Sequence, residues 1–72
     1  MKINPFTLQR LKDTYKNGTR VQLEAMDDRQ APPVGTKGTV IGVDDIGTIH
    51  VRWDNGSSLG LVYGEDSCSI LH

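Results

Sequence analysis

One short stretch, Ile49–Leu59, constrains the fold of this chain more than any other. Its apolar and polar side chains alternate up to Trp53, the only tryptophan, and Asn55-Gly56 follows directly. Alternation is typical of a half-buried strand, and Asn-Gly readily supplies the positive φ angles of a tight hairpin turn. The stretch therefore predicts a hairpin strand in which Trp53 faces the core and Arg52 faces the opposite side.

The chain from Thr19 onward predicts a mainly β fold of five short strands arranged as a small barrel. Seven of the eight glycines lie between positions 35 and 64, as expected for strands that bend sharply. The expected strands are Thr19–Ala25, Thr39–Val43, Ile49–Trp53, a segment that begins at Ser57 and contains Leu59 and Leu61, and Ser69–Leu71. The expected core comprises Val21, Leu23, Val40, Val51, Trp53, Leu59, Leu61 and Ile70.

Residues 1–18 predict a short amphipathic helix. Asn4 suits the N-cap, Pro5 suits the first helical position, and Asn17-Gly18 suits the end of the helix. The apolar stripe of this helix comprises Leu8, Leu11 and Tyr15. Because so short a helix is marginal alone, we expect it to dock on the barrel or on another subunit. Ile41 faces outward from its strand, and either this stripe or a second copy of the chain would cover it.

The length of 72 residues predicts a single domain, with the helix in residues 1–18 and the barrel in residues 19–72. One cysteine excludes an internal disulfide, which leaves packing or self-association to stabilise the fold. The first twenty residues carry five basic and one acidic side chain, and the remainder carries three basic and eight acidic ones. This asymmetry fits either an arm that contacts phosphates or a helix with a solvated basic face.

The N-terminal segment lacks the apolar core of a secretory signal, and no run is long enough to span a bilayer. We therefore expect a cytoplasmic protein, in a bacterial cell or in one infected by a phage, with no membrane partner.

Enzymatic activity is not expected. His50 is interpreted as an outward strand residue and His72 as a terminal one, and neither lies in a pattern that places it beside a nucleophile. The acidic pairs at positions 27–28, 44–45 and 65–66 are interpreted as turn residues rather than metal ligands. We therefore predict no catalytic residues, no metal site and no cofactor.

Two resemblances extend this interpretation. The segments Gly18–Val21, Ala31–Val40 and Val43–Gly60 resemble an uncharacterised small domain family of bacteria and their phages. More distantly, Gly38-Thr39-Val40, Val51–Ser57 and Ile70-Leu71 are similar to the SH3-like barrel of the Mib and Herc2 ubiquitin ligases. The second resemblance implies a five-stranded SH3-like barrel that binds peptides. The chain has Leu59–Tyr63 where that family has an Asn-Tyr-Arg segment.

Three binding functions remain open. The first is a protein-interaction adaptor or inhibitor, since small barrels present loops and a groove to peptides. The second is an oligomeric sponge that sequesters a signalling nucleotide between subunits and counters bacterial immunity. The third is nucleic-acid binding, which the acidic strand region disfavours. The candidate ligand or partner residues are Arg52, Asp54, Asn55, Ser57, Ser58, Lys37, Pro32, Pro33 and Tyr63.

Overall fold

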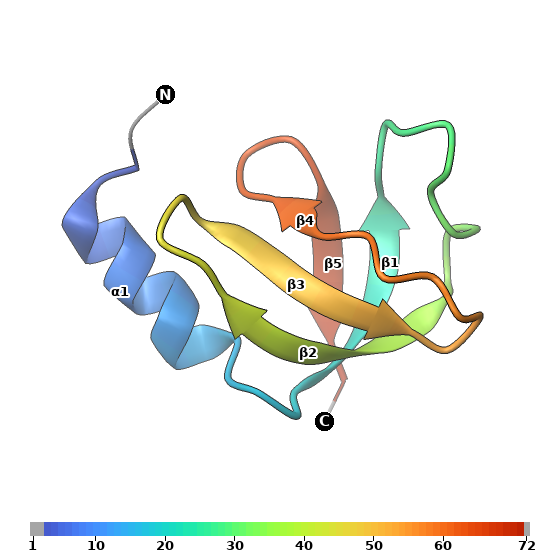
Figure 1. The fold of residues 1–72 in the computed structure, drawn as a ribbon, viewed down its shortest axis with the longest axis horizontal. Coiled ribbons are helices and arrows are strands. Elements are labelled where there is room, and N and C mark those ends of the chain that lie inside the picture. Colours follow the sequence, from blue (N-terminus) through green and yellow to red (C-terminus); the bar gives the residue numbers. More distant parts are fainter. Residues whose placement is uncertain (1–2, 72) are drawn as a thin grey trace.

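The computed structural model describes residues 3–71 and contains one antiparallel sheet flanked by a helix (Figure 1). The elements, in chain order, are α1 (Pro5–Thr14), β1 (Arg20–Ala25), β2 (Lys37–Val43), β3 (Thr48–Trp53), β4 (Leu61–Val62) and β5 (Ser67–Ile70). The spatial order of the strands is β4-β3-β2-β1-β5, and every neighbouring pair is antiparallel. The predicted five strands and N-terminal helix are confirmed. Within residues 3–71, β4 and β5 are not paired, so the sheet is open; positions 1, 2 and 72, His72 included, fall outside the described residues.

The core lies on the inward face of the sheet and includes one side chain from the helix. Trp53 is only 1% exposed, which confirms that it belongs to the core. The buried apolar residues are Leu11, Val21, Leu23, Val40, Ile49, Val51, Trp53 and Leu61. Leu59 and Ile70, also predicted in the core, are half-buried at its margin.

The helix begins as predicted and ends early. The Asn4 side-chain carbonyl accepts hydrogen bonds from the amides of the second and third helical residues, at 2.8 and 3.4 Å, and Pro5 occupies the first position. The helix ends at Thr14 rather than at Asn17-Gly18. Gly18, with φ of 94°, instead lies in the turn before β1, and its amide donates to the Val40 carbonyl at 2.8 Å. The glycine therefore serves the entry into the sheet, not the end of the helix.

Ile41 is not covered by the helix, contrary to one of the two predictions for it. Its side chain is 46% exposed, at a β-bulge where the β2–β3 register shifts between Val40 and Gly42. The apolar stripe faces the core instead of Ile41, because Leu11 is buried in the core and Tyr15 packs against it. The helix thus seals the core rather than the outer face of β2.

The turn after β3 differs from the predicted hairpin. Only Gly56 has a positive φ (93°), and the Trp53 amide donates to the Ser57 carbonyl at 2.8 Å. Beyond it, the Trp53 indole Nε1 donates to the Leu59 carbonyl at 2.9 Å. The prediction of a strand from Ser57 is therefore wrong. The Leu59 carbonyl bonds a side chain instead of a neighbouring strand, and β4 is confined to Leu61–Val62.

Candidate binding cleft

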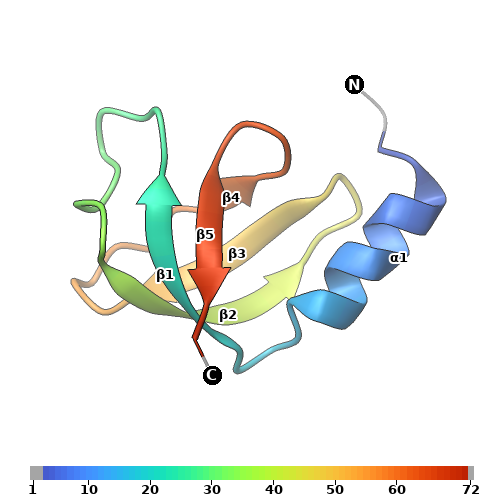
Figure 2. The ribbon, with the colours of Figure 1, turned by 180° about the vertical axis from the view of Figure 1, so that it is seen from behind.

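Most of the predicted binding residues lie at one end of the sheet. Both ribbon views place the connection of residues 26–36 close to the turn that follows β3 (Figures 1 and 2). The Asp54 amide donates at 2.8 Å to the carbonyl of Lys37, the first residue of β2, which holds this turn beside the end of the connection. Arg52 is exposed and lies opposite Thr39 on the outer face. The predicted residues at this end are Lys37, Arg52, Asp54, Asn55, Ser57 and Ser58.

Two of these residues are engaged within the fold. The Arg20 guanidinium donates to both carboxylate oxygens of Asp54, at 2.9 and 2.6 Å, and to the Thr39 hydroxyl at 2.8 Å. This pair lowers the pKa of Asp54 and raises the pKa of Arg20. The Asn55 side-chain carbonyl accepts from the Ser57 amide at 3.0 Å. Asp54 and Asn55 therefore stabilise the turn.

The two predicted prolines differ in accessibility. Pro32 is buried, so its ring does not offer a docking surface. Pro33 is exposed, and its carbonyl accepts from the amide and hydroxyl of Thr36, at 3.0 and 2.6 Å. The proline pair thus anchors and shapes the connection from β1 to β2.

Tyr63 lies in a different region, where three separate segments enclose a cleft of about 670 Å³. The segments are the start of α1, the β2–β3 turn (residues 44–47) and the β4–β5 segment (residues 63–66). Ile46 is 78% exposed and Tyr63 is 55% exposed. The lining residues are Ile3, Asn4, Thr7, Ile46, Val62, Tyr63, Gly64 and Glu65. Of the predicted binding residues, Tyr63 alone lines this cleft.

A smaller cavity of about 210 Å³ adjoins the cleft and shares Val62, Tyr63 and Gly64 with it. It lies between the edge strands β4 and β5, with Leu11 of the helix and Tyr15, the residue that follows the helix, on one side. Burial raises the pKa of the Tyr15 hydroxyl and of the Cys68 thiol in its wall. A raised pKa favours the protonated thiol, as expected for a cysteine packed against the core.

The β4–β5 segment is folded back on β4, which fixes the Tyr63 side of the cleft. The Val62 amide donates to the Asp66 carboxylate at 2.9 Å, and the Val62 carbonyl accepts from the amides of Glu65 and Asp66, at 3.1 and 2.9 Å. Gly64, with φ of 88°, permits the tight reversal. This edge of Val62 is consequently occupied, and Tyr63 and Glu65 are left exposed.

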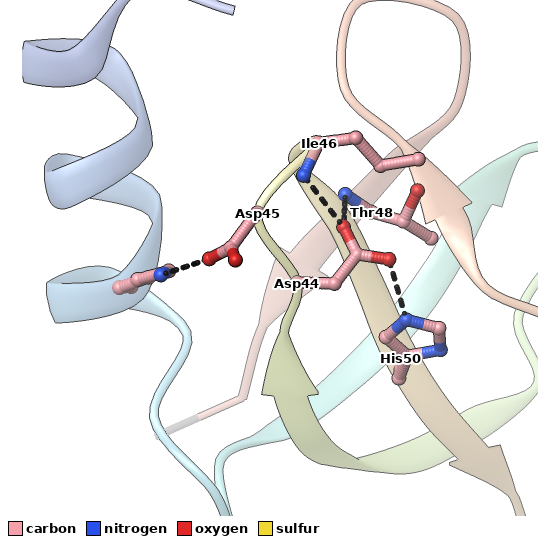
Figure 3. A network of polar contacts seen from close by, with 6 residues as sticks. Asp44, Asp45, Ile46, Thr48 and His50 are labelled. Carbon is pink, nitrogen blue, oxygen red and sulfur yellow. Dashed lines mark hydrogen bonds and ion pairs between the residues drawn. The ribbon is translucent and has the colours of Figure 1, made fainter.

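The opposite wall is held by polar contacts of the β2–β3 turn (Figure 3). One Asp44 oxygen accepts from the amides of Ile46 and Thr48, at 3.1 and 2.9 Å, and the other accepts from His50 Nε2 at 2.9 Å. Asp45 and Ile46 extend from the turn in opposite directions, and Asp45 accepts from the helix residue Lys12 at 3.0 Å. The turn is thereby joined to α1 while Ile46 projects from it.

We expect acid to weaken this turn. The hydrogen bond from His50, followed by the Thr48 amide, lowers the pKa of Asp44 below its ordinary value. A carboxyl with a lowered folded-state pKa stabilises the fold above its unfolded pKa of about 3.9, and that stabilisation is lost as pH falls through the folded-state pKa. In melting curves recorded from neutral pH down to pH ~2, the stability difference between the wild type and Asp44→Asn should therefore shrink below about pH 4.

Asp45→Asn is the matched control for this pH series, because the Asp45 side chain is 94% exposed and its ion pair is with Lys12 at the surface. Asp45→Asn should lose as much stability on acidification as the wild type does. A difference between wild type and Asp44→Asn that stays constant with pH would contradict the assignment to Asp44.

The cleft residues other than Tyr63 were not predicted as a site. The sequence held one signal for this site: Ile46 is an apolar residue at a turn position, outside the alternating pattern of the strands. Glu65 was interpreted as a turn residue. The cleft residues lie beside the start of α1 because of tertiary packing. Ile3 packs so closely on Gly47 of the β2–β3 turn that an added Cβ on Gly47 would lie 2.7 Å from Ile3 Cδ1.

Comparisons with known proteins describe the chain as a whole. None of the helices in the described residues is long and apolar enough to cross a membrane. A search of curated proteins finds no significant match. The comparison with protein families matches residues 4–71, which confirms the predicted resemblance to an uncharacterised small domain family. The chain belongs to the DUF4314 family, described as a domain of unknown function.

Proposed function

We propose that this chain is a non-catalytic protein-interaction module that binds an apolar segment of another polypeptide in the cleft. The observation that carries the proposal is the gathering of Ile46, Val62 and Tyr63, three exposed apolar side chains, around one cavity of about 670 Å³. Clustered exposed apolar side chains mark interaction sites, and ligand cavities commonly measure about 300–1,000 Å³. Because hydrogen bonds fix two walls of the cleft, binding requires little ordering of the protein.

We further propose that the five strands form an SH3-like barrel whose open seam is sealed by the helix. Support comes from the strand order, in which β1 pairs with both β2 and β5. Leu11 and Tyr15 lie with Cys68 around the small cavity between β4 and β5. Side-chain packing would thus replace the missing strand pairing there.

The charge of the cleft favours a polypeptide over a phosphate-bearing ligand. The two cavities are lined by the carboxylates of Glu65 and Asp66, and no Lys or Arg is among their lining residues within positions 3–71. Negative charges repel nucleotides and nucleic acids. Lys37 and Arg52, the two basic side chains among the predicted ligand or partner residues, lie at the end of the sheet where the Arg20–Asp54 pair is found. The sponge and nucleic-acid hypotheses stay predictions, and the binding experiments described next test them as well.

The test is selection from a phage-displayed library of random peptides, followed by titration of the selected peptides. Ile46→Ser and Tyr63→Ala should each weaken binding by about tenfold, since ~1.4 kcal/mol of lost apolar contact corresponds to that factor. Val34→Ser is the matched control, because Val34 is likewise an exposed apolar side chain, at 70%, but lies in the connection between β1 and β2. It should bind as the wild type does.

Failure to select any peptide would contradict the proposal, as would selected peptides that bind Ile46→Ser and Tyr63→Ala normally. A cyclic dinucleotide or a single-stranded oligonucleotide that binds where no peptide does would establish one of the competing functions.

A further inference from the structure

The helix α1 carries an aromatic side chain that its own fold does not bury. Phe6 is 82% exposed, whereas Leu11 on the inward side of the helix belongs to the core. Arg10 is also exposed and follows Phe6 by four residues, so the two side chains share one face of the helix. The outer face of α1 therefore presents a large apolar group beside a cation.

The cleft has the complementary chemistry. Its apolar lining includes Ile46, Val62 and Tyr63, and the adjoining cavity of about 210 Å³ exceeds the ~150 Å³ that accommodates a benzene-sized group. Glu65 supplies an exposed carboxylate in the lining. An aromatic ring accompanied by a cation suits this combination better than a neutral or anionic segment does.

The outer face of α1, which carries Phe6 and Arg10, and the cleft are neighbours on the molecule. Thr7 lines the cleft, and the adjacent Phe6 projects from the same turn of the helix without lining it. Two adjacent surfaces that complement each other can be exchanged reciprocally about a two-fold axis, and such a contact closes as a dimer. The charges of the two surfaces also agree, since Arg10 is exposed on the outer face of α1 and Glu65 lines the cleft.

We propose that two copies of this chain dimerise by reciprocal insertion of Phe6 into the partner's cleft, with Arg10 of one copy opposite Glu65 of the other. The inference rests on the proposed function, because it takes the same cleft as the interaction site and names its occupant. A partner peptide with an aromatic and a basic residue would compete with the second copy.

Sedimentation equilibrium of the full chain, from micromolar to millimolar concentration, tests the dimer. The average mass should rise from the monomer value of 7.9 kDa toward twice that value. Phe6→Ser should weaken association by at least about tenfold. Val34→Ser, which removes another largely exposed apolar side chain, away from the cleft, should associate normally. Because Phe6 is exposed, Phe6→Ser should melt as the wild type does, which separates lost association from lost folding.

A charge exchange tests the orientation. Arg10→Glu and Glu65→Arg should each weaken association by about three- to fivefold, as expected for an exposed pair, and the double variant should regain most of the loss. A chain that stays monomeric at millimolar concentration overturns the dimer, and so does an association that Phe6→Ser leaves intact. A double variant whose loss of association equals the sum of the two single losses overturns it as well. A monomer that still binds selected peptides in the cleft overturns the dimer alone, whereas a cleft that binds neither overturns the proposed function as well.

Discussion

Replacing Trp53 with alanine is expected to lower the free energy of unfolding by about 3–5 kcal/mol. The indole is 1% exposed and belongs to the cluster formed with Val51, Val40 and Leu23, so alanine would leave a cavity. It would also release the Leu59 carbonyl, which accepts from the indole Nε1 at 2.9 Å. Small domains have total stabilities of about 5–15 kcal/mol, so this loss is a large part of the whole.

Urea denaturation followed by far-ultraviolet circular dichroism measures the effect without requiring tryptophan fluorescence. Trp53→Phe retains an aromatic ring in the core and loses the indole hydrogen bond, so it should cost less than Trp53→Ala. Tyr63→Ala is the matched control, since this exposed aromatic should contribute within about 0.5 kcal/mol. An unchanged midpoint for Trp53→Ala would contradict the assignment of the indole to the core.

Gly38→Ala is expected to destabilise the fold by about 1–3 kcal/mol through overpacking. Gly38 lies opposite Trp53 in the β2–β3 ladder. A Cβ at this position would lie 2.6 Å from Val51 Cγ1, 2.8 Å from Trp53 Cε3 and 3.0 Å from the Arg52 carbonyl oxygen. The two buried side chains and the backbone of β3 leave no space for it, so either the indole or the strand must shift.

Gly42→Ala provides the control in the same strand. A Cβ there meets no atom within 4 Å, and neither Gly38 nor Gly42 has a positive φ. The comparison therefore isolates steric crowding from backbone conformation, and Gly42→Ala should be neutral or slightly stabilising. Equal losses for the two variants would contradict the packing of Gly38 against the indole.

Local sequence patterns were sufficient for the start of α1 and for the core-facing sides of β1 and β3. The alternation around Val21 and Leu23, and that ending at Trp53, correctly indicates which side chains enter the core. Asn4-Pro5 correctly indicates where the helix begins, because N-caps depend on hydrogen bonds within one turn. These features are set by residues within a few positions of one another.

Features that depend on distant residues were not predictable in the same way. Asp54 was predicted to contact a ligand or partner, yet Arg20 binds it from β1, thirty-four positions away. The end of the helix was misplaced because Gly18 is used to enter β1 beside Val40. Pro32 belongs to a proline pair typical of exposed loops, but tertiary packing buries it.

The cleft could not be predicted for the same physical reason. Its walls come from the start of α1, the turn at Ile46 and the segment around Tyr63, which are far apart in the chain. No local periodicity brings these segments together. The hydrogen bonds of Asp44 and Asp66 that shape two of its walls were interpreted only as general turn chemistry.

The most direct test of the cleft as the interaction site is a ¹H–¹⁵N NMR titration of the labelled full chain with a selected peptide. Amide shifts should concentrate at Ile46, Val62–Glu65 and the first turn of α1, and they should be absent at Val34. Shifts concentrated at Lys37 and residues 52–58, with the amides of the cleft unchanged, would contradict it and would favour the end of the sheet that carries Arg52.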